Sequence, residues 1–104
     1  MPKYLFVYHG GKRAANEAEM KKVYDAWGAW FGKMGKAVID GGNPCGQSST
    51  VHANGTVTHD GGANPASGYS LIEADNLADA HAKAKACPLL SAGGSVEVAE
   101  AMDM

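Results

Sequence analysis

The fold class can be predicted from residues 68–88, which read Gly68-Tyr-Ser-Leu-Ile-Glu-Ala-Asp-Asn-Leu-Ala-Asp-Ala-His-Ala-Lys-Ala-Lys-Ala-Cys-Pro88. Its first third, residues 68–74, has an apolar centre that predicts a strand. Asn76, or Asp75 before it, is typical of a helix N-cap, and the alanine-rich run 77–86 favours a helix. Pro88 ends that helix because proline has no backbone N–H to donate. A strand followed directly by a capped helix predicts one half of an α+β domain.

The N-terminal part of the chain repeats the same order of elements. Residues 3–9 form a continuous apolar run, which predicts a strand that is buried on both faces. Asn16 is expected to cap a helix, with Glu19 at the capping-box position, and the helix is expected to end near Met34 with Gly35 as its C-cap. One apolar stripe follows the helix at steps of three and four residues: Met20, Val23, Trp27, Trp30, Phe31 and Met34.

Shorter runs complete the pattern. Residues 36–40 and 95–101 predict two more strands, and residues 49–53 and 56–59 flank Asn54-Gly55, which is a hairpin signal. The order strand-helix-strand, hairpin, strand-helix-strand predicts a ferredoxin-like βαββαβ domain with an inserted hairpin. Its two crossovers would interlock into one antiparallel sheet with both helices on one face. We expect a single domain over residues 1–104.

Composition excludes several classes of function. The net charge is -2, so the chain lacks the basic field that holds nucleic acid or an anionic membrane. No apolar run reaches the length of a membrane span, and the N-terminus does not resemble a signal peptide, so we expect a cytoplasmic protein. Cys45 and Cys87 lack the spacing of a zinc or redox motif. Two reduced thiols are expected in that compartment, with a disulfide as the alternative.

Glycine pairs mark the ends of the predicted strands. In the predicted topology they gather at one edge of the sheet, together with the ends of four strands at His9, Asp40, Ser67 and Ser95. His9 and Asp40 would lie two strands apart there, about 10 Å at the backbone, so a water or a bound molecule would fit between them. The four pairs are Gly10-Gly11, Gly41-Gly42, Gly61-Gly62 and Gly93-Gly94.

Five stretches in sequence order resemble a YCII-related (DGPF-type) domain, in the small-protein branch of that family. The resemblance covers nearly the whole chain. It implies a dimeric α+β barrel, in which two sheets pack through their open faces, and a cleft that serves a ligand or a reaction. The stretches are Tyr4-Leu-Phe-Val-Tyr-His-Gly-Gly11, Trp27-Gly-Ala-Trp-Phe-Gly-Lys-Met-Gly35, Asp40-Gly-Gly-Asn-Pro-Cys-Gly46, residues 68–88 quoted above, and Gly93-Gly-Ser-Val-Glu-Val-Ala-Glu100.

The chain departs from the pattern of this family in two places. Other branches carry a histidine in the first helix, paired with an aspartate, and the predicted first helix here has no histidine. The Asp-Gly-Pro-Phe signature is replaced by Asp60-Gly-Gly-Ala63. The proposed catalytic pair of the family is therefore not carried over to this chain.

His9 is the main candidate for chemistry, because an imidazole at a strand end can act as acid or base near neutral pH. Asp40 would orient it. The alternatives are a turn histidine bonded to backbone and an Asx-turn aspartate. Four further residues are candidates for ligand contact: Asn43 through its amide, Trp30 at the border of an apolar pocket although the stripe indicates core, Ser67 at the rim, and Glu97 on the open face of the sheet.

No phosphate loop, dinucleotide fingerprint or nucleophile elbow occurs in the sequence, and His52, His59 and Asp60 lack the spacing of a metal site. We therefore expect neither a metal nor a cofactor. Two hypotheses remain. The first is a homodimer that binds a small molecule at the sheet edge, with acid/base assistance from His9. The alternative is a dimeric, non-catalytic interaction or regulatory module.

Overall fold

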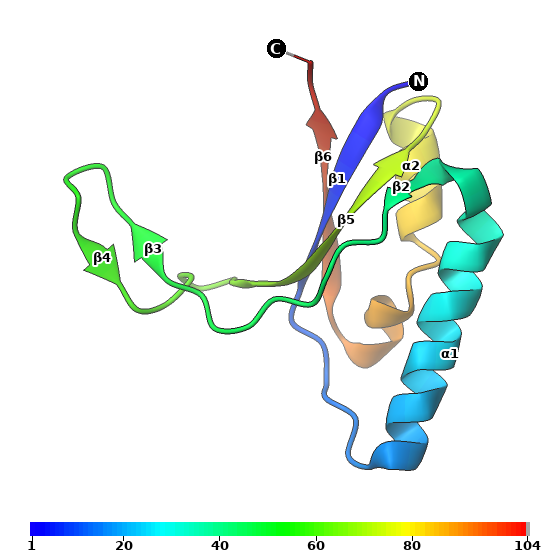
Figure 1. Ribbon diagram of the computed structural model, residues 1–104, viewed down its shortest axis with the longest axis horizontal. Coiled ribbons are helices and arrows are strands. Elements are labelled where there is room, and N and C mark those ends of the chain that lie inside the picture. Colours follow the sequence, from blue (N-terminus) through cyan, green and yellow to red (C-terminus); the bar gives the residue numbers. More distant parts are fainter. Residues whose placement is uncertain (104) are drawn as a thin grey trace.

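Two helices and a four-stranded antiparallel sheet form the body of the protein, and a two-stranded sheet stands apart from it (Figure 1). The computed structural model describes residues 1–103, and the predicted α+β class is confirmed. The elements are β1 (Lys3–His9), α1 (Glu17–Met34), the 3-10 helix η1 (Gly35–Ala37), β2 (Val38–Asp40), β3 (Thr50–Val51), β4 (Val57–Thr58), β5 (Ala66–Glu73), α2 (Leu77–Ala84), the 3-10 helix η2 (Pro88–Ala92) and β6 (Ser95–Ala101).

The strands of the main sheet lie in the order β2-β5-β1-β6, and all neighbours are antiparallel. β1 and β2 therefore run in the same direction with β5 between them, as the sequence predicted. In the centre of the sheet Leu5 lies opposite Leu71 of β5 and opposite Ala99 of β6. The strand β6 has a partner on one side only, so it forms one edge of the sheet.

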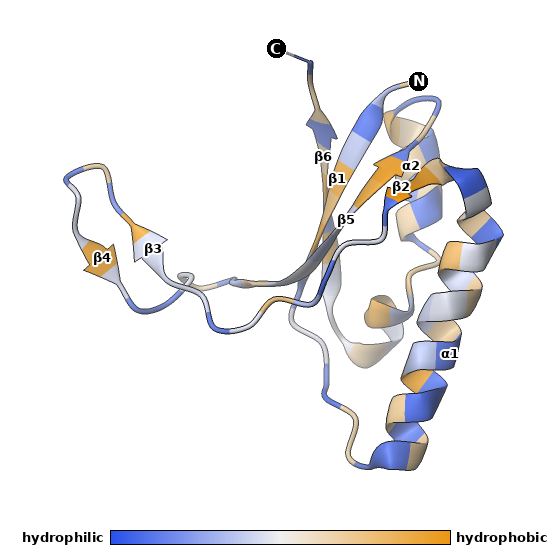
Figure 2. Cartoon of the chain, in the orientation of Figure 1, coloured by the Kyte–Doolittle hydropathy of each residue, from blue (hydrophilic) through white to orange (hydrophobic). Residues whose placement is uncertain are grey.

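The core lies between the helices and one face of the sheet. Alternate residues of β1, namely Tyr4, Phe6 and Tyr8, are buried there, and the Trp30 ring stacks on Phe6 with centroids 6.3 Å apart. Both helices cover this same face, because Trp30 of α1 and Ala80 of α2 belong to one buried cluster (Figures 1 and 2). Leu5 and Val7, which point to the other face, are only partly buried, so the prediction that this strand is buried on both faces is wrong for the single chain.

Helix α1 begins and ends where its caps predict. The Asn16 side chain accepts a hydrogen bond from the Glu19 backbone N–H, and Gly35 ends the helix with a φ of 56°. The predicted apolar stripe holds only for its C-terminal half. Met20 and Val23 are exposed, because the N-terminal half of α1 extends past the end of the sheet (Figure 1).

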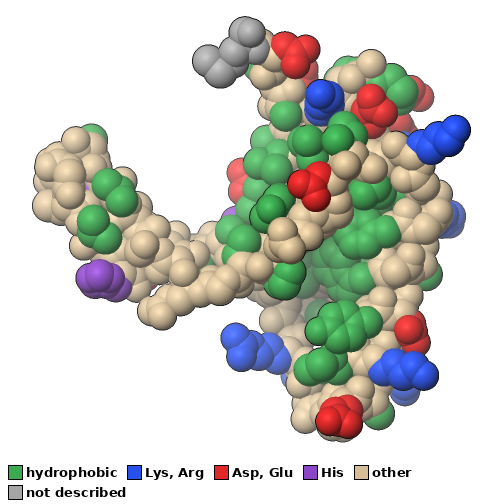
Figure 3. Space-filling view, viewed as in Figure 1, with side chains coloured by type: hydrophobic (Ala, Val, Ile, Leu, Met, Phe, Trp, Pro, Cys, Tyr) green, Lys and Arg blue, Asp and Glu red, His purple; other side chains and the backbone are tan. Residues whose placement is uncertain are grey.

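The hairpin forms an arm, which we define as residues 49–60, that projects from the side of the sheet opposite the helices (Figure 1). Its strands are shorter than predicted, because a five-residue turn closes the hairpin with a hydrogen bond from His52 N–H to Thr56 O. Val51 lies opposite Val57, and these side chains are 71% and 49% exposed. Figure 3 shows apolar side chains on the arm, away from the apolar body.

Four other boundaries, in three elements, differ from the prediction. β2 begins at Val38 because residues 35–37 form the 3-10 helix η1, and α2 ends at Ala84, two residues early. β5 begins at Ala66 and ends at Glu73.

Candidate functional site

The end of β1 carries a β-bulge, which shapes the predicted rim. Tyr8 lies opposite Gly68, and the next residue, His9, lies opposite Ala66, so Ser67 is an extra residue in β5. On the other side His9 lies opposite Ser95. A bulge bends its strand and re-aims a side chain, and such irregularities recur next to active sites. The predicted proximity of His9, Ser67 and Ser95 is confirmed.

His9 is held from two directions at this end of the sheet. Its Nε2 atom lies 2.9 Å from Oε1 of Glu97 on β6, and its Nδ1 atom lies 3.1 Å from the carbonyl oxygen of Pro65, just before β5. The histidine is 7% exposed, whereas the Glu97 side chain is 61% exposed. The carboxylate therefore offers its second oxygen to the surroundings, and the imidazole does not.

The two partners determine the protonation state of His9. A carbonyl oxygen and a carboxylate both accept hydrogen bonds, so each ring nitrogen must donate a proton to satisfy them. The hydrogen bond to Glu97 raises the pKa of His9 above its ordinary value of 6.5, against the opposing effect of burial, and the Pro65 carbonyl raises it further. Both contacts therefore favour the protonated, imidazolium form of His9.

Asp40 lies away from His9. It pairs with Leu71 of β5, and Leu71 lies opposite Leu5, four residues before His9, which is about 13 Å along the strand. Its Oδ1 atom accepts a hydrogen bond of 2.8 Å from the Gly42 N–H, which is an Asx turn. The predicted arrangement of His9 with Asp40 is therefore wrong, because the short strand β2 pairs with the C-terminal part of β5 and not with its N-terminal end, where His9 lies.

Two of the predicted contact residues are engaged inside the chain. Trp30 is 4% exposed, and its indole N–H donates to the carbonyl oxygen of Lys83 at 3.0 Å. It belongs to the core, so the prediction that it borders a ligand pocket is wrong. The Asn43 amide donates to the Tyr69 hydroxyl at 3.3 Å, and this amide is exposed.

Glu97 lies on the face of the sheet that the sequence predicted for it. It is opposite Val7, whereas Val96 and Val98 pack against the core. Val7 and Glu97 thus share the open face, which is the face that the helices leave uncovered. The same face carries partly buried apolar side chains: Leu5, Val7, Tyr69 and Leu71.

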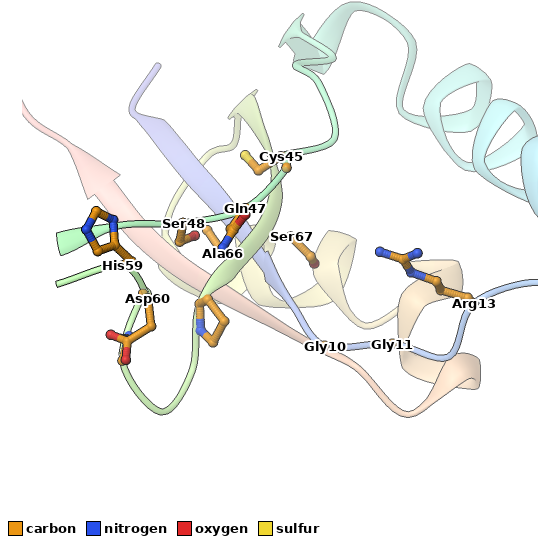
Figure 4. A pocket seen from close by; sticks show the side chains of 14 residues that line it. Gly10, Gly11, Arg13, Cys45, Gln47, Ser48, His59, Asp60, Ala66 and Ser67 are labelled. Atoms are coloured by element: carbon orange, nitrogen blue, oxygen red, sulfur yellow. The ribbon is translucent and has the colours of Figure 1, made fainter.

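A cleft of about 560 Å³ lies beside the bulge, between the turn after β1 and the base of the arm (Figure 4). Ser67 is the predicted contact residue that lines it, and Pro65, which bonds His9, forms part of the wall. Two of the four glycine pairs meet in this cleft. Its lining is Gly10, Gly11, Arg13, Cys45, Gly46, Gln47, Ser48, His59, Asp60, Gly61, Gly62, Pro65, Ala66 and Ser67.

Apart from Asp60, which accepts a hydrogen bond from the Gly62 N–H, the polar side chains around the cleft differ from those in the other loops. Asp40, Asn54 and Asn76 each accept a hydrogen bond from a nearby backbone N–H. Within residues 1–103, the hydroxyl of Ser67 and the guanidinium of Arg13 form no hydrogen bond to another group of the protein. The side chains of Gln47, Ser48 and His59 form none either. The cleft therefore presents polar groups that are available to a ligand.

Sequence reasoning missed Arg13 and the contact between His9 and Glu97. Arg13 lies in a polar turn without any motif, and only the fold of the arm base against that turn makes it part of a cleft. Glu97 was placed on the correct face, and pairing the strand ends His9 and Ser95 would have brought it near the imidazole. That register was the available signal.

Cys45 and Cys87 form no disulfide, and burial raises the pKa of the Cys87 thiol to about 11. Among residues 1–103, no three His, Cys, Asp or Glu side chains gather as metal ligands would. None of the helices in this range combines the length and apolarity that a membrane crossing requires. Searches of protein-family models, curated proteins and solved structures found no match to this chain.

Proposed function

We propose that this protein is a YCII-like homodimer that binds a small molecule in the cleft at the end of its sheet. The observation that carries this proposal is the cleft of about 560 Å³, whose polar lining has hydrogen-bonding capacity that the protein does not use. Pockets for small ligands have volumes of this order and combine apolar walls with a few polar groups. The resemblance of residues 4–11, 27–35 and 68–88 to YCII-related domains supports the family assignment.

The dimer follows from the open face of the sheet. Leu5, Val7 and Leu71 lie there without a covering layer, and a sheet normally buries its apolar face against another layer. A second copy would cover this face with its own identical face, as in a two-fold symmetric interface. The strand order β2-β5-β1-β6 supports a ferredoxin-like βαββαβ domain, and two such sheets packed through their open faces would form a dimeric α+β barrel.

His9 and Glu97 would act as a proton-sharing pair beside the cleft. Both nitrogens of His9 already have acceptors, so Glu97 is the member whose free oxygen can meet a ligand. A ligand that donates a hydrogen bond to Glu97 would use this exposed oxygen. In this role His9 positions Glu97 and holds a proton, which is the form of acid/base assistance that the geometry favours.

Two measurements test the proposal. A fragment library screened by thermal shift at neutral pH is expected to yield compounds that raise the melting temperature, because a ligand of the native state stabilises it. Light scattering is expected to give twice the chain mass at micromolar concentration. Leu71→Arg on the open face should yield monomers, whereas Tyr24→Arg on the exposed side of α1 should leave the dimer intact. A wild-type monomer at that concentration removes the dimer from the proposal.

The second candidate is a non-catalytic interaction or regulatory module in the cytoplasm. The arm favours it, because an isolated two-stranded hairpin is marginally stable and this one exposes Val51 and Val57 together. The two free thiols of the chain, Cys45 and Cys87, fit a reducing compartment. A library that yields no ligand, together with unchanged dimerisation in His9→Gln, would favour this reading.

A further inference from the structure

The charges around the cleft are unevenly distributed, and this asymmetry indicates which ligands it accepts. We propose that the cleft binds a small organic anion, a carboxylate or a phosphate monoester, with the guanidinium of Arg13 as the partner of the anionic group. This inference rests on the proposed function, since it specifies the ligand class of the same cleft.

Arg13 is the fixed positive charge of the cleft. Figure 4 shows it extending from the turn after β1 toward the bulge of β5, where the Ser67 side chain points back toward it. The turn is anchored next to Arg13, because the Lys12 N–H donates to the Ala92 carbonyl oxygen at 2.8 Å. In the part of the chain that the structure describes, no carboxylate lies within 4.0 Å of the guanidinium.

An arginine without a carboxylate partner suits an anionic ligand. Its planar guanidinium can donate two parallel hydrogen bonds to the oxygens of a carboxylate or phosphate, and charged hydrogen bonds are roughly twice as strong as neutral ones. The Ser67 hydroxyl, on the bulge that faces Arg13, can supply a further hydrogen bond. The Arg13 guanidinium and the Ser67 hydroxyl thus approach the cleft from two different segments, the turn after β1 and the start of β5.

The one acidic group of the cleft lies at the other side. Figure 4 shows Asp60 and His59 at the base of the arm, across the cleft from Arg13. The Oδ1 atom of Asp60 accepts a hydrogen bond from the Gly62 N–H at 3.1 Å. The anionic group of the ligand would therefore lie near Arg13, and its uncharged part would lie toward the base of the arm.

The volume favours an organic anion over a bare inorganic one. A cleft of about 560 Å³ is far larger than one phosphate or sulfate ion. Ala66 and Pro65 form apolar wall beside Ser67, and such a surface can bury a hydrocarbon group. The ligand expected from this lining joins one oxyanion to a compact apolar body.

A matched series of probes tests the charge preference. Benzoate, phenyl phosphate, benzamide and benzamidinium share one ring and differ in the charge of the attached group. Each is titrated into the full chain at pH 7 and constant ionic strength, and amide chemical shifts report both affinity and location. We expect the better of the two anions to bind at least tenfold more tightly than benzamide, with shifts at Gly11 and Ser67. Comparison of benzoate with phenyl phosphate identifies which oxyanion the cleft prefers.

Variants assign the effect to Arg13. Arg13→Gln is expected to weaken the preferred anion by about ten- to a hundredfold, as loss of a charged hydrogen bond does, and to leave benzamide unchanged. Lys12→Gln removes a neighbouring charge that does not line the cleft and serves as the matched control. It should change the affinity by less than threefold. Ser67→Ala should cost a smaller, severalfold loss for the same anion.

The outcomes distinguish this inference from the proposed function. If benzamide or benzamidinium binds in the cleft as tightly as both anions, the cleft binds small molecules but the anion assignment is overturned. Anion binding that Arg13→Gln leaves unchanged also overturns the assignment. If none of the four probes and no fragment of the library shifts any cleft residue, both statements fail together.

Discussion

The Nε2 atom of His9 and the Oε1 atom of Glu97 lie 2.9 Å apart, although 88 residues separate them in the chain. The imidazole also bonds the carbonyl oxygen of Pro65, so the end of β1 is tied both to β6 and to the segment that leads from the arm into β5. One side chain therefore fixes the relative positions of three distant segments at the end of the sheet. The cleft is built on two of these segments.

The protonation of His9 makes stability depend on pH. Because the folded-state pKa is raised above 6.5, this pair contributes stability that is fully present below about pH 6.5 and is lost as pH rises through the raised value. We expect the wild-type free energy of unfolding to decrease by roughly 1 kcal/mol across that window, a small effect because Glu97 is mostly exposed. Urea unfolding at pH 6 and at pH 8.5 measures it.

Variants of the pair should remove this dependence. Glu97→Gln lowers stability at pH 6 and flattens the profile, whereas Glu100→Gln on the same strand leaves the profile as in the wild type. A Glu97→Gln protein that keeps the full wild-type slope would show that the titrating group is elsewhere.

A buried chain of hydroxyl groups leads from β1 to the loop after β2. The Tyr8 hydroxyl donates to Ser70 Oγ at 2.7 Å, and Ser70 Oγ donates to the Gly41 carbonyl oxygen at 2.7 Å. Ser70→Ala deprives both neighbours of a partner and is expected to destabilise by about 1–3 kcal/mol. Tyr8→Phe leaves the bond to Gly41 and should cost less.

The same chain affects the ionisation of Tyr8. Burial raises the pKa of this phenol to about 12, although its hydrogen bond to Ser70 acts in the opposite direction. A titration followed by ultraviolet absorbance should therefore show at least one tyrosine fewer ionising near pH 10 in the folded wild type than in the unfolded chain, because the pKa of Tyr4 is raised as well. Ionisation of all four tyrosines near pH 10 in the folded protein would contradict the burial of Tyr8.

Gly42 occupies a position that no other residue can fill without movement of the backbone. Its φ is 71°, and an added Cβ would lie 1.8 Å from the Tyr69 carbonyl oxygen. We expect Gly42→Ala to destabilise by at least about 1–3 kcal/mol, the cost of such a backbone conformation alone. Gly46→Ala is the matched control, because open space surrounds its added Cβ. Equal melting temperatures for the two variants would refute the close approach.

The arm should contribute little to the stability of a single chain. Val51 and Val57 are exposed and contact the core nowhere, so Val51→Ser is expected to change the free energy of unfolding by less than about 0.5 kcal/mol. Phe6→Ala in the core should cost about 3–5 kcal/mol in the same assay. A loss above 1 kcal/mol in Val51→Ser that grows with protein concentration would show that the arm lies in an interface between chains.

Local signals in the sequence were sufficient for much of the fold. The bounds of β1 and β6 and both caps of α1 were predicted as the structure has them, because an apolar run, an Asn cap and a Gly cap act through neighbouring residues. The burial of α1 was less predictable. A helical stripe does not say how far the helix extends past its sheet, and so Met20 and Val23 were assigned to the core wrongly.

Beyond the pairing of His9 with Ser95, the site depended on long-range register that the sequence does not specify. The position of Asp40 is set by where the short strand β2 pairs along β5, and the extra residue Ser67 is set by a bulge that no motif announces. The candidate residues at strand ends, His9 and Ser67, were placed correctly because topology alone brings strand ends together. Arg13 was not predicted, because it lines the cleft only together with residues at the base of the arm, which lie far from it in the sequence.

Binding of a small molecule in the cleft beside the bulge can be mapped by amide chemical shifts with a fragment library. Compounds that bind are expected to shift a contiguous set of amides around the cleft, with Gly11, Gly62 and Ser67 among them. Shifts confined to the separate groove between α2 and β6, at His81 and Val98, or no shifts with any fragment, would contradict it.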